Sequence, residues 1–161
     1  KVVPYHKATD ELIETFDKIL ISPGPGIPPD FPRLETIVKK FYRTKSFLGI
    51  CLGHEAIALA FGAKIYSLGR VFHGVSKKTA VVDKSNYIFQ NIPDKFEGGL
   101  YHSWALEKNT LPKQLIITAV AEDGVIMAFS HKQFDLTGFQ FHPESIMTKY
   151  GSQMIYNWLK H

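Results

Sequence analysis

The sequence predicts a three-layer α/β domain with a largely parallel central sheet and an antiparallel extension in its second half. Two observations support this prediction. In residues 1–62, short apolar runs alternate with stretches of helical apolar spacing, which is the pattern of parallel βαβ units with right-handed crossovers. In residues 65–141, strand-like runs follow one another through short connections, which is typical of antiparallel strands.

The composition is that of a soluble globular protein. The chain has 161 residues, of which 45% are hydrophobic and 21% charged, so it is long enough to bury a core and a poor fit to intrinsic disorder. No apolar run approaches the roughly 20 residues of a membrane span, and no signal-peptide pattern opens the chain. The net charge of +4 is scattered, which disfavours nucleic-acid binding. Cys51 is the only cysteine, so no intramolecular disulfide can form, and we expect a cytoplasmic protein.

The first elements alternate between strand and helix. Residues 2–3 are expected to end a strand, and Thr9 to cap a helix with an apolar side over residues 12–16. Residues 19–21 form a short apolar run, typical of a strand buried on both faces, and the Pro-Gly-Pro-Gly segment 23–26 stops it. A two-residue strand rarely begins a βαβ sheet. We therefore expect residues 1–161 to be one domain that lacks its first strand and helix.

The second βαβ unit follows directly. Apolar residues between 34 and 41 recur at helical spacing, residues 47–50 form another buried strand, and residues 56–61 predict a helix that ends at Gly62. The second half then predicts strands over residues 65–68, 79–82, 99–101, 115–121, 125–130 and 138–141. Glu122-Asp123-Gly124 is typical of a hairpin turn, and the apolar residues of 150–159 predict a final helix.

The segment Gly49-Ile50-Cys51-Leu52-Gly53 is the strongest chemical signal. A buried strand leads into a cysteine, a helix follows at once, and glycines on both sides leave room for a sharp turn. This is the nucleophile-elbow pattern with cysteine in place of serine. The adjoining helix N-terminus is expected to stabilise a thiolate, and the next backbone N–H to serve an oxyanion. A buried core cysteine is the alternative interpretation.

Two further segments complete a candidate site. His142 and Glu144 follow a predicted strand, and a carboxylate two positions after a histidine can fix its tautomer, as in catalytic triads. A surface pair in a turn is the alternative. The Pro-Gly-Pro-Gly segment 23–26 also lies at the carboxyl end of a strand, where α/β sheets bind ligands, although many such clusters are only turns.

Together and in this order, these segments resemble the class I glutamine amidotransferases, over essentially the whole chain. Further motifs are similar to the small subunits of anthranilate synthase and aminodeoxychorismate synthase: Gly53-His54, His73-Gly74, Tyr101-His102-Ser103 and residues 140–145, Gln-Phe-His-Pro-Glu-Ser. The resemblance implies a flavodoxin-like fold with a further strand and helix before residue 1. It also implies a larger chorismate-binding synthase as partner, with no membrane or nucleic acid involved.

The resemblance also implies roles for individual residues. Cys51, His142 and Glu144 would form a triad that hydrolyses the side-chain amide of L-glutamine, with no metal or cofactor. The residues that would bind glutamine are Gly24, Pro25, Gly26, Leu52, Glu55, Ser103 and Trp104. The backbone N–H groups of Gly26 and Leu52 would hold the oxyanion.

Glu55 departs from the family pattern, which usually has glutamine at this position. A carboxylate cannot donate the hydrogen bonds of an amide, and it repels a nearby thiolate. Three alternatives to a glutaminase stay open. One is a non-catalytic regulatory subunit, in which Glu55 marks lost chemistry. The others are a different cysteine hydrolase of related fold and a nucleic-acid binder, whose association would depend steeply on salt.

Overall fold

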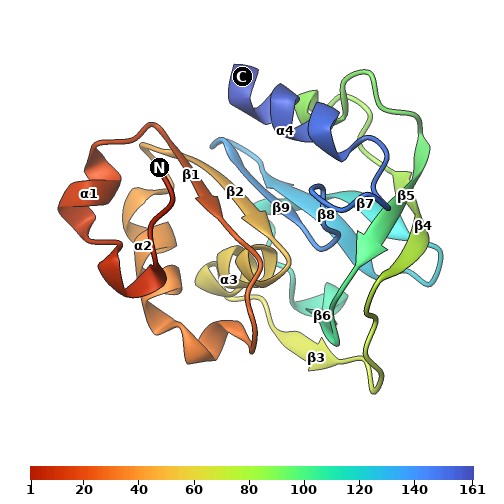
Figure 1. Ribbon diagram of the computed structural model, residues 1–161, viewed down its shortest axis with the longest axis horizontal. Coiled ribbons are helices and arrows are strands. Elements are labelled where there is room, and N and C mark those ends of the chain that lie inside the picture. The colour runs from red at the N-terminus through yellow and green to blue at the C-terminus, as the bar shows by residue number, and fades with distance from the viewer.

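The computed structural model describes residues 1–161, which form four α-helices and nine strands (Figure 1). The helices are α1 (Asp10–Glu14), α2 (Pro32–Phe41), α3 (Leu52–Ala60) and α4 (Gly151–Lys160). The strands are β1 (Lys18–Ile21), β2 (Ser46–Ile50), β3 (Ile65–Ser67), β4 (Val75–Val81), β5 (Lys95–Leu100), β6 (Trp104–Leu106), β7 (Leu115–Ala121), β8 (Ile126–His131) and β9 (Leu136–Phe139). Short 3₁₀ turns are η1 (Tyr5–Lys7), η2 (Pro28–Asp30), η3 (Tyr87–Phe89) and η4 (Lys108–Thr110). None of the helices is long and apolar enough to cross a membrane.

Seven strands form the main sheet, in the order β1-β2-β9-β8-β7-β4-β5. Strands β1, β2 and β9 are parallel, and every other pair in this sheet is antiparallel. The α/β class is therefore confirmed, but the sheet is mixed rather than largely parallel. The physical reason is that strands β7, β8 and β9 follow one another through short connections, which allow only antiparallel neighbours. Strands β3 and β6 form a separate two-stranded sheet.

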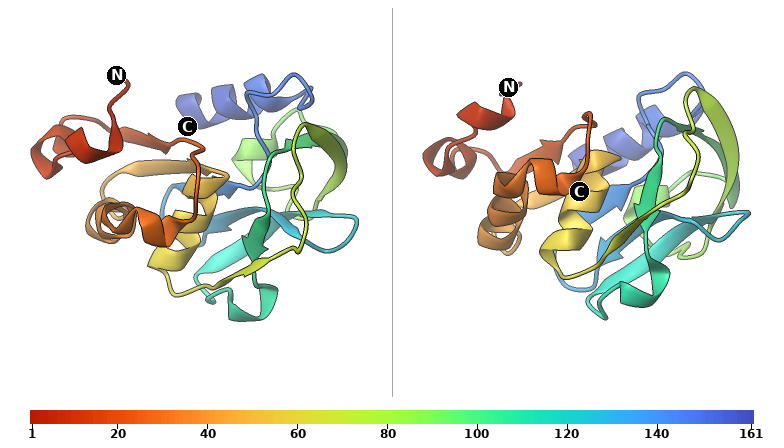
Figure 2. Two further views of the ribbon diagram at one scale, coloured as in Figure 1. Left: turned by 60° about the horizontal axis from the view of Figure 1, so that its bottom comes forward. Right: turned by 90° about the horizontal axis from the view of Figure 1, so that it is seen from below.

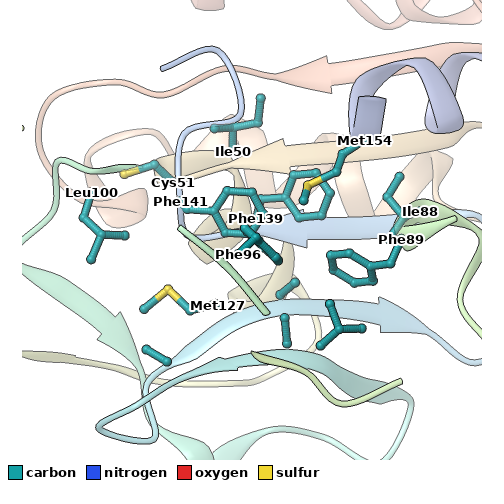
Figure 3. Close-up of a cluster of buried hydrophobic side chains, with 14 of the residues drawn as sticks. Ile50, Cys51, Ile88, Phe89, Phe96, Leu100, Met127, Phe139, Phe141 and Met154 are labelled. Carbon is teal, nitrogen blue, oxygen red and sulfur yellow. The ribbon is translucent and has the colours of Figure 1, made fainter. Parts of the chain in front are cut away.

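Helices cover both faces of the main sheet and create two hydrophobic cores. Helices α2 and α3 pack on one face, and α4 with η3 packs on the other (Figure 2). Strand β2 contributes to both cores. Phe47 lies in the first core, beside α2 and α3, and Leu48 lies in the second core, beside α4 and η3. Figure 3 shows the second core, in which the sulfur of Cys51 lies at one end, beyond the stacked rings of Phe139 and Phe141.

Several local predictions are confirmed. The Thr9 side chain accepts a hydrogen bond from the backbone N–H of Leu12 and caps α1, as predicted. Strand β7 and helix α4 lie where the apolar patterns place them. The turn at residues 122–124 joins two antiparallel strands, with Gly124 at φ +81°.

Other local predictions are wrong. Residues 2–3 form no strand and are followed by a 3₁₀ turn. Strand β1 is not buried on both faces, because it is an edge strand and Leu20 is 43% exposed. Strand β4 begins earlier than predicted, and the three-residue strand β6 was not predicted. Neither segment has a long apolar run, so its strand conformation depends on pairing with a neighbouring strand.

Candidate active site

Cys51 occupies a strained turn between strand β2 and helix α3. Its backbone has φ 51° and ψ −102°, a conformation that L-residues rarely adopt. Its N–H donates to the carbonyl of Phe139 at 2.7 Å, and its carbonyl accepts from the N–H of Glu55 at 3.0 Å. The end of β2, the end of β9 and the first turn of α3 thus hold this turn in place. Non-glycine residues in such conformations concentrate at functional sites.

The two glycines around Cys51 are required by close packing. A Cβ on Gly49 would lie 2.4 Å from the backbone of Gly53, and a Cβ on Gly53 would lie 2.3 Å from the carbonyl oxygen of Ile21. Both distances are too short for a real side chain. The predicted elbow is therefore present, because β2, α3 and β1 approach one another too closely for any residue larger than glycine.

His142 and Glu144 form a hydrogen-bonded pair just after β9. The Nδ1 atom of His142 lies 2.7 Å from Oε1 of Glu144. Since a carboxylate only accepts hydrogen bonds, Nδ1 carries the proton and Nε2 presents a lone pair. Nε2 is buried and has no hydrogen-bond partner in the chain. The backbone of His142 is held by Gly99 and Thr148, which bond to its N–H and its carbonyl.

One pocket of about 160 Å³ brings Cys51 together with the residues expected to bind glutamine, while His142 and Glu144 are not in its lining. It is lined by Cys51 together with Gly24, Pro25, Gly26, Leu52, Glu55, Tyr101, His102, Ser103 and Trp104. All seven expected glutamine-binding residues are in this set. They come from the loop after β1, from the start of α3 and from the end of the β5–β6 connection with the first residue of β6, which lie far apart in the sequence.

The pocket contains backbone donors suited to an oxyanion. A hydrogen bond from the N–H of Leu52, the first residue of α3, lowers the pKa of the Cys51 thiol. The N–H of Gly26 makes no backbone hydrogen bond. The turn that carries Gly26 is fixed by Asp30, whose Oδ2 accepts from the N–H of Ile27 at 3.0 Å. Donors fixed before the reaction can stabilise negative charge without reorganising.

The resting site disfavours the thiolate. Burial and, after it, the nearby charge of Glu55 raise the pKa of Cys51 to about 12, against the opposing hydrogen bond from the N–H of Leu52. The helix N-terminus does favour the thiolate through the N–H of Leu52, as expected, but this effect is outweighed in the resting site. Desolvation and a neighbouring carboxylate outweigh one backbone donor.

Glu55 is a buried acid in the wall of this pocket. Its side chain belongs to the elbow helix, one turn after Cys51, and the residue is only 3% exposed. Burial raises the pKa of Glu55 to about 7, opposed by a hydrogen bond from Gln140 Nε2 at 3.4 Å. The carboxyl group can therefore change its charge near neutral pH.

The family model for glutamine amidotransferase class-I matches residues 1–161. The chain belongs to the class I glutamine amidotransferase family. A class I amidotransferase fold also accounts for the architecture, since the solved structure of a glutamine amidotransferase from Thermotoga maritima has a TM-score of 0.71. That comparison covers 98% of this chain and 66% of the other at 20% identity, so it supports the fold alone.

Two relatives within this amidotransferase family carry specific names. The chain is 40% identical over 158 residues to anthranilate synthase component 2 of Mycobacterium tuberculosis, covering 96% of this chain and 67% of the relative. It is 39% identical over 142 residues to aminodeoxychorismate synthase component 2 of Klebsiella aerogenes, covering 88% of this chain and 75% of the relative.

Sequence reasoning missed two members of this amidotransferase site. The Tyr101 ring packs edge-on against the ring of His142 at 4.8 Å between centroids, and its hydroxyl lies 3.2 Å from Ser145 Oγ. The Gln140 side chain lies between Cys51 and Glu55. Both belong to motifs that carried the family resemblance, which was the available signal.

The remaining histidines do not assemble a metal site. No group of three His, Cys, Asp or Glu side chains in residues 1–161 is arranged to hold a metal ion. His54 is fully buried against Phe129, and burial lowers its pKa to about 3, so it is neutral in the folded amidotransferase domain. His102 is bound through Nδ1 to the carbonyl of Trp104 at 2.6 Å.

Proposed function

We propose that this chain is the glutaminase subunit of an anthranilate or aminodeoxychorismate synthase. It would hydrolyse L-glutamine and pass ammonia to a partner that aminates chorismate. The observation that carries the proposal is the strained Cys51 in the pocket wall, at the start of α3, together with the His142–Glu144 pair after the adjacent strand β9. The names of the two relatives support the choice of partner.

In the first step, the Cys51 sulfur attacks the side-chain amide carbon of glutamine. Because the resting group is a thiol, its proton must leave as the S–C bond forms, and it would pass to Nε2 of His142, which has no hydrogen-bond partner in the chain. The carbonyl oxygen gains negative charge, which the N–H groups of Leu52 and Gly26 would stabilise. Glu144 would hold the imidazolium in position.

In the second step, the C–N bond breaks. His142 gives its proton to the departing nitrogen, so ammonia leaves and a γ-glutamyl thioester remains on Cys51. Water then attacks the thioester carbon while His142 takes one of its protons. The C–S bond breaks, the sulfur regains a proton from His142, and glutamate is released. All protons are accounted for by this one histidine, and no metal or cofactor enters.

Covalent labelling tests the nucleophile. A glutamine-mimicking diazo-ketone should alkylate Cys51 in the folded protein, and peptide mapping is unambiguous because the chain has no other cysteine. Excess glutamine should protect the thiol. A thiol that reacts only after unfolding would make Cys51 a core residue and contradict the proposal.

A second measurement tests the partnership. Glutamate release should be slow for the isolated chain and faster with the chorismate-binding subunit, since a partner can favour the competent geometry around Cys51. Product analysis of the reconstituted pair would then distinguish anthranilate from 4-amino-4-deoxychorismate. Equal rates with and without the partner would indicate an uncoupled hydrolase.

The buried carboxyl of Glu55 favours one second candidate, a regulatory subunit with impaired chemistry. Glu55 lines the pocket, and its charge raises the pKa of Cys51. For that candidate, the chain would bind the synthase without turning over glutamine. Absence of diazo-ketone labelling combined with stable binding to the partner would favour it.

A further inference from the structure

Gln140 occupies a position that couples the candidate nucleophile to the buried acid. It directly follows strand β9, and its backbone N–H donates to the carbonyl of Met127 at 2.9 Å. The residue is fully buried, with 0% exposure. Its side chain extends toward the elbow, where Nε2 lies 3.4 Å from Glu55 Oε1 and 3.9 Å from Cys51 Sγ.

The side-chain hydrogen bonds of Gln140 go to these two groups alone. Its Oε1 is buried and has no hydrogen-bond partner. A buried amide oxygen without a partner is unfavourable. The cost of the unpaired oxygen is consistent with a role for the other end of the amide. Its N–H group faces two side chains that can carry negative charge.

Without such a donor, Glu55 and the Cys51 thiolate would face each other across a buried space. Two like charges one helical turn apart disfavour each other's ionisation. The other charged or titratable groups around the sulfur are Glu144 and His142 after β9 and His102 in the pocket wall. Gln140 is the only neutral side chain recorded in hydrogen-bond contact with both Cys51 and Glu55.

We infer that Gln140 is a positioning residue, whose side-chain N–H group donates to both the Cys51 sulfur and the Glu55 carboxylate and so allows two negative charges in one buried site. The contact with the sulfur lowers the cost of forming the thiolate, whereas the contact with Glu55 favours the carboxylate that opposes it. The inference deepens the proposed function, since it rests on Cys51 being the nucleophile. Gln140 acts through Cys51 and Glu55 and forms no bond to substrate.

The test measures the thiol and requires no glutamine turnover. Alkylation of Cys51 by iodoacetamide, followed from pH 6 to 10, reports the thiolate fraction at each pH. Gln140→Met keeps the side-chain length but removes the donor. We expect its alkylation to be about threefold slower at pH 8, because the sulfur loses a donor while Glu55 becomes easier to protonate. Gln153→Met on α4 is the matched control, because Gln153 also donates to a side-chain oxygen but lies outside the pocket.

A double-variant cycle separates the contact with Glu55 from the contact with sulfur. In a Glu55→Gln background, Gln140→Met should slow alkylation about tenfold, because the sulfur loses its donor and no carboxylate at position 55 can be protonated to compensate. An equal effect in both backgrounds would overturn the inference, as would a pH profile unchanged from wild type. If Gln140→Met does not fold, Gln140→Leu removes the same donor and should give the same order of effects in the two backgrounds.

The outcomes also distinguish this inference from the proposed function. If the diazo-ketone fails to label Cys51 while the iodoacetamide profile shifts as expected, the coupling of Gln140, Glu55 and Cys51 stands and the glutaminase proposal fails. If the diazo-ketone labels Cys51 and the profile does not shift, the glutaminase proposal stands and the role of Gln140 is overturned.

Discussion

Nδ1 of His142 donates to Oε1 of Glu144 across 2.7 Å, although the Glu144 side chain is 56% exposed and that of His142 only 11%. The imidazole is thus buried while the carboxylate that orients it faces solvent. Water can solvate Glu144 and weaken its electrostatic effect on the imidazole. The hydrogen bond therefore serves mainly to fix the tautomer of His142.

This arrangement predicts unequal effects for the two members of the pair. His142→Ala should abolish glutamine hydrolysis, because the base that Glu144 orients is lost. Glu144→Gln should lower kcat by about 10²-fold, less than the roughly 10⁴-fold seen when a buried triad aspartate becomes its amide. Single-turnover glutamate release measures both. Glu122→Gln, an exposed glutamate that pairs with Lys78, is the matched control, and a wild-type rate for either site variant would remove the pair from the mechanism.

Glu55→Gln should increase kcat/KM for glutamine. The amide restores a donor in the pocket and removes a charge that opposes the thiolate, so we expect roughly a tenfold gain at pH 8 if one hydrogen bond worth about 1.4 kcal/mol is restored. Because the pKa of Glu55 is raised to about 7, wild type should regain part of this difference as the pH falls below 7. An unchanged kcat/KM from pH 6 to 8.5 would show that the charge of Glu55 has no effect on the reaction.

The same substitution should change stability in a pH-dependent way. Burial raises the pKa of Glu55 from an ordinary 4.5 to about 7, so the unfolded chain loses this proton at lower pH than the folded chain. Stability contributed by the protonated carboxyl is fully present below pH 4.5 and is lost as the pH rises to 7. Relative to Glu55→Gln, the wild-type free energy of unfolding should therefore fall by about 3 kcal/mol between pH 4.5 and 8.

Urea unfolding of both proteins at matched pH measures this difference. His54 also loses stability in acid, because burial depresses its pKa to about 3, but it does so in both proteins and cancels in the comparison. A difference that stays constant with pH would mean that Glu55 titrates alike in the folded and unfolded chain.

Gly53→Ala should destabilise the domain by about 1–3 kcal/mol, the usual cost of overpacking, because its Cβ would lie 2.3 Å from the Ile21 carbonyl oxygen. Gly24→Ala is the matched comparison. Its Cβ would meet only the end of the Leu52 side chain, at 2.8 Å, and a side chain can move more easily than a backbone. Thermal unfolding should rank Gly53→Ala as the less stable variant, and the reverse order would contradict the packing explanation of the elbow.

The sequence alone determined the features that depend on local pattern. The elbow around Cys51, the strand β2 before it and the helix α3 after it follow from an apolar run, two glycines and a helical segment. The order of segments was enough to indicate the amidotransferase family. These features are local, so spacing along the chain encodes them.

Tertiary structure alone decided which groups share a buried environment. The exposure of Leu20 depends on β1 being an edge strand, and the mixed sheet depends on β9 pairing with both β2 and β8. The pKa of Cys51 and the contact of Gln140 with Glu55, 85 positions away, depend on desolvation and charge across elements that are distant in sequence. Such effects fall off with distance in space, which residue spacing does not record.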